Sequence, residues 1–173
     1  MDSTFNYNDA TIYINKGNTL VNLQRYEEAV AAYNQALQLE PTNPLIYANK
    51  DVALKSLQRY GEGLAACDRA IQLDPNYTLA WACKGDILSN IGRFLEALSA
   101  LDRAIQLDPS DAFPYTKKGR ALCELQFYSE GLQAFDRAIQ LDPGNALAYA
   151  LKGAVLVKLQ RYQEGLAVCE IAI

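Results

Sequence analysis

Apolar side chains recur along the chain at the spacing of helices that bury one face. Two such stripes fall within the stretch 44–77, one formed by Tyr47, Leu54 and Leu57 and the other by Leu64, Cys67 and Ile71. Steps of three, four and seven residues are the period of an amphipathic α-helix. The pattern therefore predicts a pair of antiparallel helices in this stretch, and no β-sheet is expected.

A leucine, an acidic residue and a proline recur together where each predicted second helix ends. The motif occurs as Leu39-Glu40-Pro41, Leu73-Asp74-Pro75, Leu107-Asp108-Pro109 and Leu141-Asp142-Pro143, and its prolines are 34 residues apart. The residue before a proline is pushed away from helical torsions, so the acidic residue should close the helix. The first helices should be capped by side chains that accept backbone N–H groups, namely Asp9, Asn43, Asp111 and Asn145, and Pro44 suits a first helical position.

Counting back from the prolines divides the chain into a leader, residues 1–9, and five repeats. The repeats span 10–43, 44–77, 78–111, 112–145 and a truncated 146–173. Within this register several positions keep one residue type. The fourth is aromatic, as Tyr13, Tyr47, Trp81, Tyr115 and Tyr149, and the twenty-seventh is alanine, as Ala36, Ala70, Ala104, Ala138 and Ala172.

These features resemble the tetratricopeptide repeat, and the resemblance covers the chain from Ala10 to the end. It implies an all-α fold, a right-handed α-solenoid superhelix of antiparallel helical hairpins, with residues 10–173 as a single domain. In that family the first helices line a concave groove. Two departures concern packing only: lysine recurs at the seventh position, and Cys67, Leu101 and Cys169 replace an aromatic at the twenty-fourth.

Small side chains at the eighth and twentieth positions should let the two helices of a hairpin approach closely. Asp51 stands where the other repeats have glycine, and Gly63 in the same repeat should leave room for its carboxylate. We expect Cys67 and Cys169 to be small buried side chains, because free cysteine is among the most buried residue types. The recurring lysines should be structural, with the stem on apolar surface and the ammonium in water.

The composition argues against catalysis and against nucleic acid. Sixteen Lys and Arg against twenty Asp and Glu give a net charge of -4, so no positive excess is available for phosphates. The absence of histidine removes the commonest general base and metal ligand, and the four cysteines show no metal-binding spacing. No enzyme activity, metal or other cofactor is predicted. A polar start and the lack of an apolar run of roughly 18 residues favour a cytoplasmic protein without a membrane span.

The expected groove changes character along the chain. Asn15, Asn18 and Asn49 could pair with the backbone of an extended peptide, because amides donate and accept hydrogen bonds. The alternative is that they are solvated polar residues on an exposed helix face. A chaperone-tail clamp is disfavoured, since Ile14, Leu79 and Cys83 stand where that clamp has basic residues.

Further along, Lys117 and Arg120 could act together on an acidic side chain or a terminal carboxylate, with Asp86 opposing them. An ordinary charge contact between repeats is the alternative reading. Leu79 and Phe113 would form an apolar lip over the groove, unless such residues pack only on neighbouring repeats.

The last predicted helix carries Leu166, Cys169 and Ile173 on the face that a sixth repeat would bury. We expect that this face is covered, either by a continuing chain or by another copy, which makes a homo-oligomer one alternative. The leading hypothesis is an adaptor that binds a peptide segment of a protein partner in its groove. The rival is a structural spacer or a scaffold that self-associates through this face.

Overall fold

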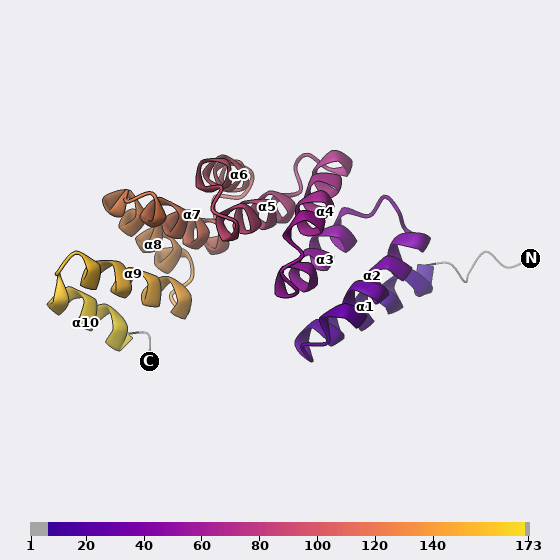
Figure 1. The fold of residues 1–173 in the computed structure, drawn as a ribbon, viewed down its shortest axis with the longest axis horizontal. Coiled ribbons are helices and arrows are strands. Elements are labelled where there is room, and N and C mark those ends of the chain that lie inside the picture. The colour runs from indigo at the N-terminus through magenta and orange to yellow at the C-terminus, as the bar shows by residue number, and fades with distance from the viewer. Residues whose placement is uncertain (1–6, 172–173) are drawn as a thin grey trace, which may run out of the picture. The chain divides into compact units, whose positions relative to one another are not determined.

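The computed structural model describes residues 7–171, and these residues form ten α-helices and no strand (Figure 1). In chain order they are α1 (Tyr7–Asn22), α2 (Tyr26–Leu39), α3 (Pro44–Ser56), α4 (Tyr60–Leu73), α5 (Thr78–Asn90), α6 (Phe94–Leu107), α7 (Ala112–Glu124), α8 (Tyr128–Leu141), α9 (Ala146–Lys158) and α10 (Tyr162–Ile171). Each predicted repeat holds one pair of helices, so the predicted all-α fold of helical hairpins is confirmed.

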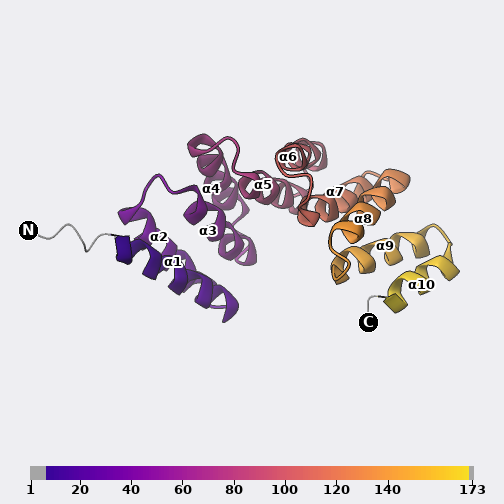
Figure 2. The same cartoon turned by 180° about the vertical axis from the view of Figure 1, so that it is seen from behind.

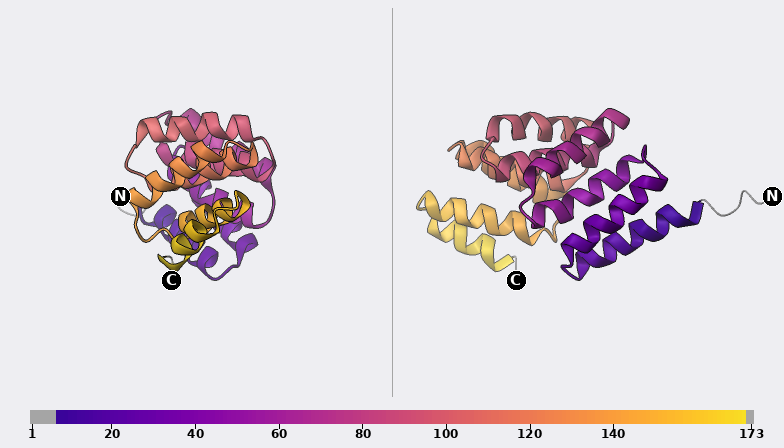
Figure 3. Two further views of the ribbon diagram at one scale, coloured as in Figure 1. Left: turned by 90° about the vertical axis from the view of Figure 1, so that its left-hand side faces the viewer. Right: turned by 45° about the vertical axis from the view of Figure 1, so that its right-hand side comes forward.

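The chain divides into two compact units, with the boundary between Ile87 and Leu88 inside α5. In the first unit α1 packs on α2, α3 packs on α4, and α2 contacts α3. In the second unit α7 packs on α8 and α9 on α10, while α6 contacts α7 and α8 contacts α9. The hairpins α1–α2 and α9–α10 can be followed from both sides in Figures 1 and 2, and α9–α10 also in the yellow helices of Figure 3. Within each unit, a second helix therefore contacts the first helix of the next hairpin.

Three of the four predicted capping side chains stand at the start of a first helix. Asn43 Oδ1 accepts the N–H of Leu45 at 3.1 Å, and Asp111 Oδ1 accepts the N–H of Phe113 at 2.9 Å. Asn145 Oδ1 caps α9 by accepting the N–H of Ala148 at 3.0 Å. The prediction for Asp9 is wrong, because α1 already begins at Tyr7 and residue 9 lies inside its first turn.

Four of the five hairpins have a glutamine in the left-handed backbone conformation at the turn between their two helices. Gln24, Gln58, Gln126 and Gln160 have φ between 57° and 67°, and the third repeat has Gly92 with φ of 78°. In the first repeat the N–H of Arg25 reaches the carbonyl of Leu20 at 2.8 Å and that of Gln24 reaches Val21 at 2.9 Å. This is the Schellman arrangement, which satisfies the last carbonyls of a helix and reverses the chain.

Glycine at the eighth position allows the close approach that the sequence predicts. A Cβ atom on Gly119 would lie 2.6 Å from the Phe135 ring and 3.0 Å from the carbonyl oxygen of Gly131. A Cβ on Gly63 would lie 3.0 Å from Asp51 Oδ1, so glycine there leaves room for that carboxylate. The predicted compensation between Asp51 and Gly63 is confirmed.

Three of the five recurring lysines link their repeat to the one before it. Lys84 Nζ lies 2.7 Å from Asp68 Oδ1, Lys118 lies 2.6 Å from Asp102, and Lys152 lies 2.5 Å from Asp136. These ammonium groups are therefore bonded to a carboxylate, which corrects the expectation that they end in water. The aspartates occupy the twenty-fifth position of the preceding repeat, so the contact follows the 34-residue period.

The two cysteines that were predicted to be buried differ in their exposure. Cys67 is fully buried and packs with Cys83 and Ile87, and burial raises the pKa of both thiols. Cys169, in contrast, is exposed. The prediction of a small buried side chain is thus confirmed for Cys67 and wrong for Cys169.

Candidate functional site

Two of the predicted asparagines meet in the first unit. Asn18 Oδ1, on α1, accepts a hydrogen bond from the Tyr33 hydroxyl at 2.7 Å and one from Asn49 Nδ2 at 3.3 Å. Tyr33 belongs to the core position of α2, and burial raises its pKa to about 12, so the hydroxyl stays a donor at neutral pH. The core of the first hairpin thus orients a polar pair between α1 and α3.

A cavity of about 280 Å³ lies beside this pair. It is lined by Asn18, Val21, Asn22, Tyr33, Asn49 and Val52. None of these side chains carries a formal charge at neutral pH, while three of them are amides. The cavity therefore offers neutral groups that both donate and accept hydrogen bonds, which suits a peptide backbone.

Two other predicted residues of the first unit lie apart from the cavity lining. Asn15 is exposed on α1, and its backbone carbonyl accepts the Thr19 hydroxyl at 2.8 Å. Leu79 is exposed in the first turn of α5. Both side chains remain accessible to solvent.

The second unit has a cavity of about 180 Å³ at the same repeat positions. It is lined by Arg120, Cys123, Glu124, Tyr128, Phe135, Leu151, Ala154, Val155 and Lys158. Phe135 takes the place that Tyr33 has in the first repeat, and Arg120 takes the place of Asn18. The lining is therefore charged, with two cations and one carboxylate, where the first cavity is neutral.

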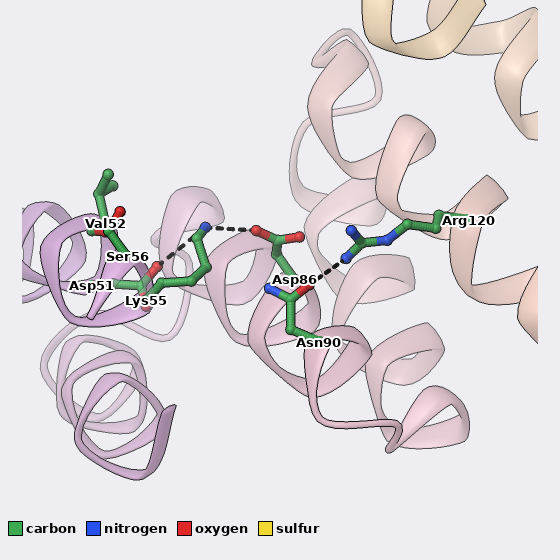
Figure 4. A network of polar contacts seen from close by, with 7 residues as sticks. All are labelled: Asp51, Val52, Lys55, Ser56, Asp86, Asn90 and Arg120. Atoms are coloured by element: carbon green, nitrogen blue, oxygen red, sulfur yellow. Dashed lines mark hydrogen bonds and ion pairs between the residues drawn. The ribbon is translucent and has the colours of Figure 1, made fainter. Parts of the chain in front are cut away.

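The two predicted cations on α7 each have an ordered contact. Lys117 Nζ lies 5.0 Å from the centre of the Phe113 ring, which is a cation–π distance. Arg120 Nη2 donates to Asn90 Oδ1 at 2.9 Å (Figure 4). These contacts hold the two side chains in place on the surface of α7.

Asp86 is only 2% exposed and belongs to a buried network in the first unit (Figure 4). Its Oδ2 lies 2.6 Å from Lys55 Nζ, which also lies 4.0 Å from Asp51 Oδ2. Burial raises the pKa of Asp51 to about 6, against the opposing effect of the Lys55 charge. Although burial lowers the pKa of Lys55, Asp86 raises it above its ordinary value, so the ammonium stays charged.

The residues predicted for self-association lie on α10. Leu166 is 57% exposed and Cys169 is exposed, while Ile173 lies outside the described residues. Sequence reasoning missed Tyr33 and Lys55. The signals were a phenolic hydroxyl at a position that is Cys, Leu or Phe in the other repeats, and a lysine one helical turn after Asp51.

None of the helices in residues 7–171 is both long enough and apolar enough to cross a bilayer.

Comparisons with known proteins place the chain in one family. A model described as TPR repeat matches residues 17–50, and models described as tetratricopeptide repeat match residues 66–99 and 116–173. A search of curated protein sequences gave no match.

Solved structures share the fold over most of their length. MamA 41-end from Desulfovibrio magneticus RS-1 is 24% identical, with a TM-score of 0.74 over 93% of this chain and 91% of that one. TTC0263, a thermophilic TPR protein from Thermus thermophilus, is 18% identical, with a TM-score of 0.85 over 94% and 89%. YrrB, described as a TPR protein with an unusual peptide-binding site, is 25% identical, with a TM-score of 0.65 over 97% and 87%.

The family models, the helical hairpins and the solved structures agree on the type of fold. They support a protein-interaction scaffold in general terms, since this family typically consists of non-catalytic interaction modules. The chain belongs to the tetratricopeptide repeat family.

Proposed function

We propose that the protein is a non-catalytic adaptor whose first helices bind an extended peptide segment of a partner protein. The observation that carries this proposal is the pair of cavities between first helices of consecutive repeats, α1–α3 and α7–α9. Both are lined from the same repeat positions but with different chemistry. An extended peptide places alternate side chains and backbone groups against such a surface.

The first unit would bind the peptide without regard to its charge. Asn18 and Asn49 present amide groups at the rim of a neutral cavity, and Asn15 is exposed on the same helix as Asn18. Amides can pair with backbone N–H and carbonyl groups of any sequence. Leu79 adds an exposed apolar contact on α5.

The second unit would select an acidic segment. Arg120 and Lys158 line its cavity beside one carboxylate, Glu124, and Lys117 stands one helical turn from Arg120. Arg and Lys near a carboxylate of the ligand would form charge-assisted hydrogen bonds, and Phe113 would offer apolar contact. Asp86 is buried and bonded to Lys55, and we assign it no contact with the peptide.

Site-specific photo-crosslinking in a lysate of the source organism tests this assignment. A photoreactive residue replaces Asn49 on α3 or Ala154 on α9, and matched controls replace the exposed Ala65 on α4 or Gln140 on α8. Each of the two groove positions is expected to capture a defined segment of a partner protein, which is then synthesised. Its affinity should fall at least tenfold in the variant with Asn15, Asn49 and Arg120 all changed to Ala. Equal capture at the control positions, or unchanged affinity of the triple variant, would refute the assignment of the peptide to the first helices.

A second candidate function is a scaffold that self-associates through α10. Leu166 and Cys169 favour it, because both are exposed and belong to one helix. Sedimentation velocity over a range of concentrations tests this alternative. Self-association predicts larger species at high concentration, and these should disappear in Leu166→Asp. A monomer at every concentration would contradict this function.

A further inference from the structure

One arginine position of the repeat carries an exposed aromatic side chain in the second unit. The sixteenth position holds Arg25, Arg59, Arg93 and Arg161 in four repeats, and Phe127 in the fourth. Each of those arginines forms an ion pair with the glutamate three residues later, at 2.6 or 2.7 Å. Phe127 is 51% exposed instead. The fourth repeat thus replaces a charged pair by an apolar side chain in contact with water.

A second departure lies on the preceding repeat. The eighteenth position is Glu27, Gly61, Ser129 and Gln163 in four repeats, and Leu95 in the third. Leu95 is 73% exposed, more than any other large hydrophobic side chain within the described part of the chain. Most of Leu95 and about half of Phe127 are thus in contact with water, where the other repeats carry polar residues or glycine.

Leu95 lines a hollow, and Phe127 follows another residue of its lining by two positions. A cavity of about 300 Å³ is lined by Gly92, Arg93, Phe94, Leu95, Glu96 and Leu125. Leu125 ends α7 two residues before Phe127, and α6 and α7 pack on each other. The turns α5–α6 and α7–α8 therefore present an apolar edge, which we call the turn edge, formed by Leu95, Leu125 and Phe127. Exposed apolar clusters with polar rims mark interaction sites.

The turn edge has an acidic neighbour. Glu130 follows Phe127 by three residues, as Glu96 and Glu164 follow their arginines. Because those glutamates reach the sixteenth side chain, the Glu130 carboxylate lies within reach of whatever packs on Phe127. Over residues 7–171 no side chain forms a hydrogen bond or an ion pair with it. A ligand that covers Phe127 therefore meets an acceptor for a positive charge.

We propose that the turn edge binds a segment of a partner protein in which an apolar side chain stands beside a lysine or arginine. The apolar side chain would enter the hollow that Leu95 and Leu125 line and would contact the exposed Phe127, and the basic group would pair with Glu130. This surface is formed by the turns and not by the first helices, so it is a second docking site beyond the proposed function. The charge of Glu130 selects a basic segment over an acidic one.

The residue found at the sixteenth position of the other repeats gives the test variant. Phe127→Arg restores the residue that four repeats carry and gives Glu130 its usual partner, so the fold is expected to persist, as a thermal melt followed by circular dichroism will verify. A phage library of random 12-residue peptides is panned on the wild type, with depletion on Phe127→Arg. Enriched peptides are synthesised, and their affinities are measured by fluorescence anisotropy against the wild type, Phe127→Arg, Leu95→Gln, Glu130→Gln and Asn49→Ala.

The proposal requires enriched peptides with a basic residue next to an apolar one. Their affinity should fall at least tenfold in Phe127→Arg and Leu95→Gln, fall about threefold or more in Glu130→Gln, and stay unchanged in Asn49→Ala. Three results would overturn it: no enriched peptide, enriched peptides without a basic residue, or equal binding to Phe127→Arg. Self-association of the wild type that is lost in Phe127→Arg would also overturn it, since a second copy would then occupy the edge. A loss in Asn49→Ala alone would place the peptide on the first helices.

Discussion

Lys55 donates to Asp86 across 2.6 Å, while the Asp51 carboxylate on the same helix as Lys55 stands 4.0 Å from that ammonium. One cation thus serves two buried carboxylates. Among the described residues neither oxygen of Asp51 has a hydrogen-bond partner. An ionised group in that situation opposes folding, since the interior replaces water without replacing its hydrogen bonds.

The first prediction concerns the pH dependence of stability. Burial raises the pKa of Asp51 from 3.8 to about 6, so between these values the folded state holds a proton that the unfolded state has released. The free energy of unfolding therefore falls as pH rises from about 4 to about 6, by about 2–3 kcal/mol, and this loss persists at higher pH. Asp51→Asn, which stays neutral, should remove this part of the slope. Urea denaturation between pH 4 and 8 measures it, and parallel profiles for the wild type and the variant would contradict the assignment.

The second prediction concerns the removal of the cation. Lys55→Met leaves Asp51 and Asp86 buried without a positive neighbour from Lys55, and the expected loss of stability is about 3–5 kcal/mol. The further change of Asp86 to Leu should restore a large part of it, because an apolar pair no longer buries a charge. Chemical denaturation of the single and double variants measures the coupling. Additive losses in the double variant would show that Lys55 and Asp86 do not act as a pair.

The third prediction concerns the left-handed turns. Gln126 adopts φ of 67°, which costs a residue with a Cβ roughly 1 kcal/mol relative to glycine. Gln126→Gly should therefore stabilise the protein by about that amount, and Gly92→Gln should destabilise it by a similar amount. Thermal melts of both variants against the wild type measure the two opposite shifts. A loss of stability in Gln126→Gly would mean that the glutamine side chain makes a contact of greater value than the backbone strain.

The 34-residue register predicted most of the fold because hairpin boundaries depend on local chemistry. Asn43, Asp111 and Pro44 act within one turn of their own backbone, and they stand in the structure as the sequence predicts. The prediction that Asp9 caps the first helix failed because an acidic residue is also favourable inside the first turn of a helix. Whether a capping residue starts the helix or follows its start depends on the residues before it.

Contacts between repeats were harder to predict, although the register contains them. Lys118 and Asp102 are 16 residues apart and belong to different hairpins, so neither helix predicts the pair alone. Lys55 and Asp86 are 31 residues apart and belong to different repeats, so neither helix predicts this pair alone. Cys169 shares its position with the buried Cys67, but burial is a property of the surrounding repeats and not of the position.

For the candidate site too, the sequence predicted local features but not the contacts between helices. The sequence placed Asn18 and Asn49 on first helices, but it could not predict that the Tyr33 hydroxyl would orient Asn18, since that bond joins a core position to a surface one. The cavities likewise require two repeats in contact. Their difference in charge can be traced in the sequence only after the lining positions are known.

The fourth prediction tests the close helix crossing with a matched pair of glycine substitutions. Gly119→Ala would place a Cβ 2.6 Å from the Phe135 ring and 3.0 Å from a backbone oxygen, and neither neighbour can retreat within a packed hairpin. The expected destabilisation is about 2–3 kcal/mol or more. Gly61→Ala, in an exposed part of α4 with nothing within 4 Å of the new Cβ, should instead stabilise the protein by about 0.5–1 kcal/mol through helix propensity. Urea denaturation of both variants measures the contrast, and equal stability of the two would refute a crossing that depends on the absence of a side chain at Gly119.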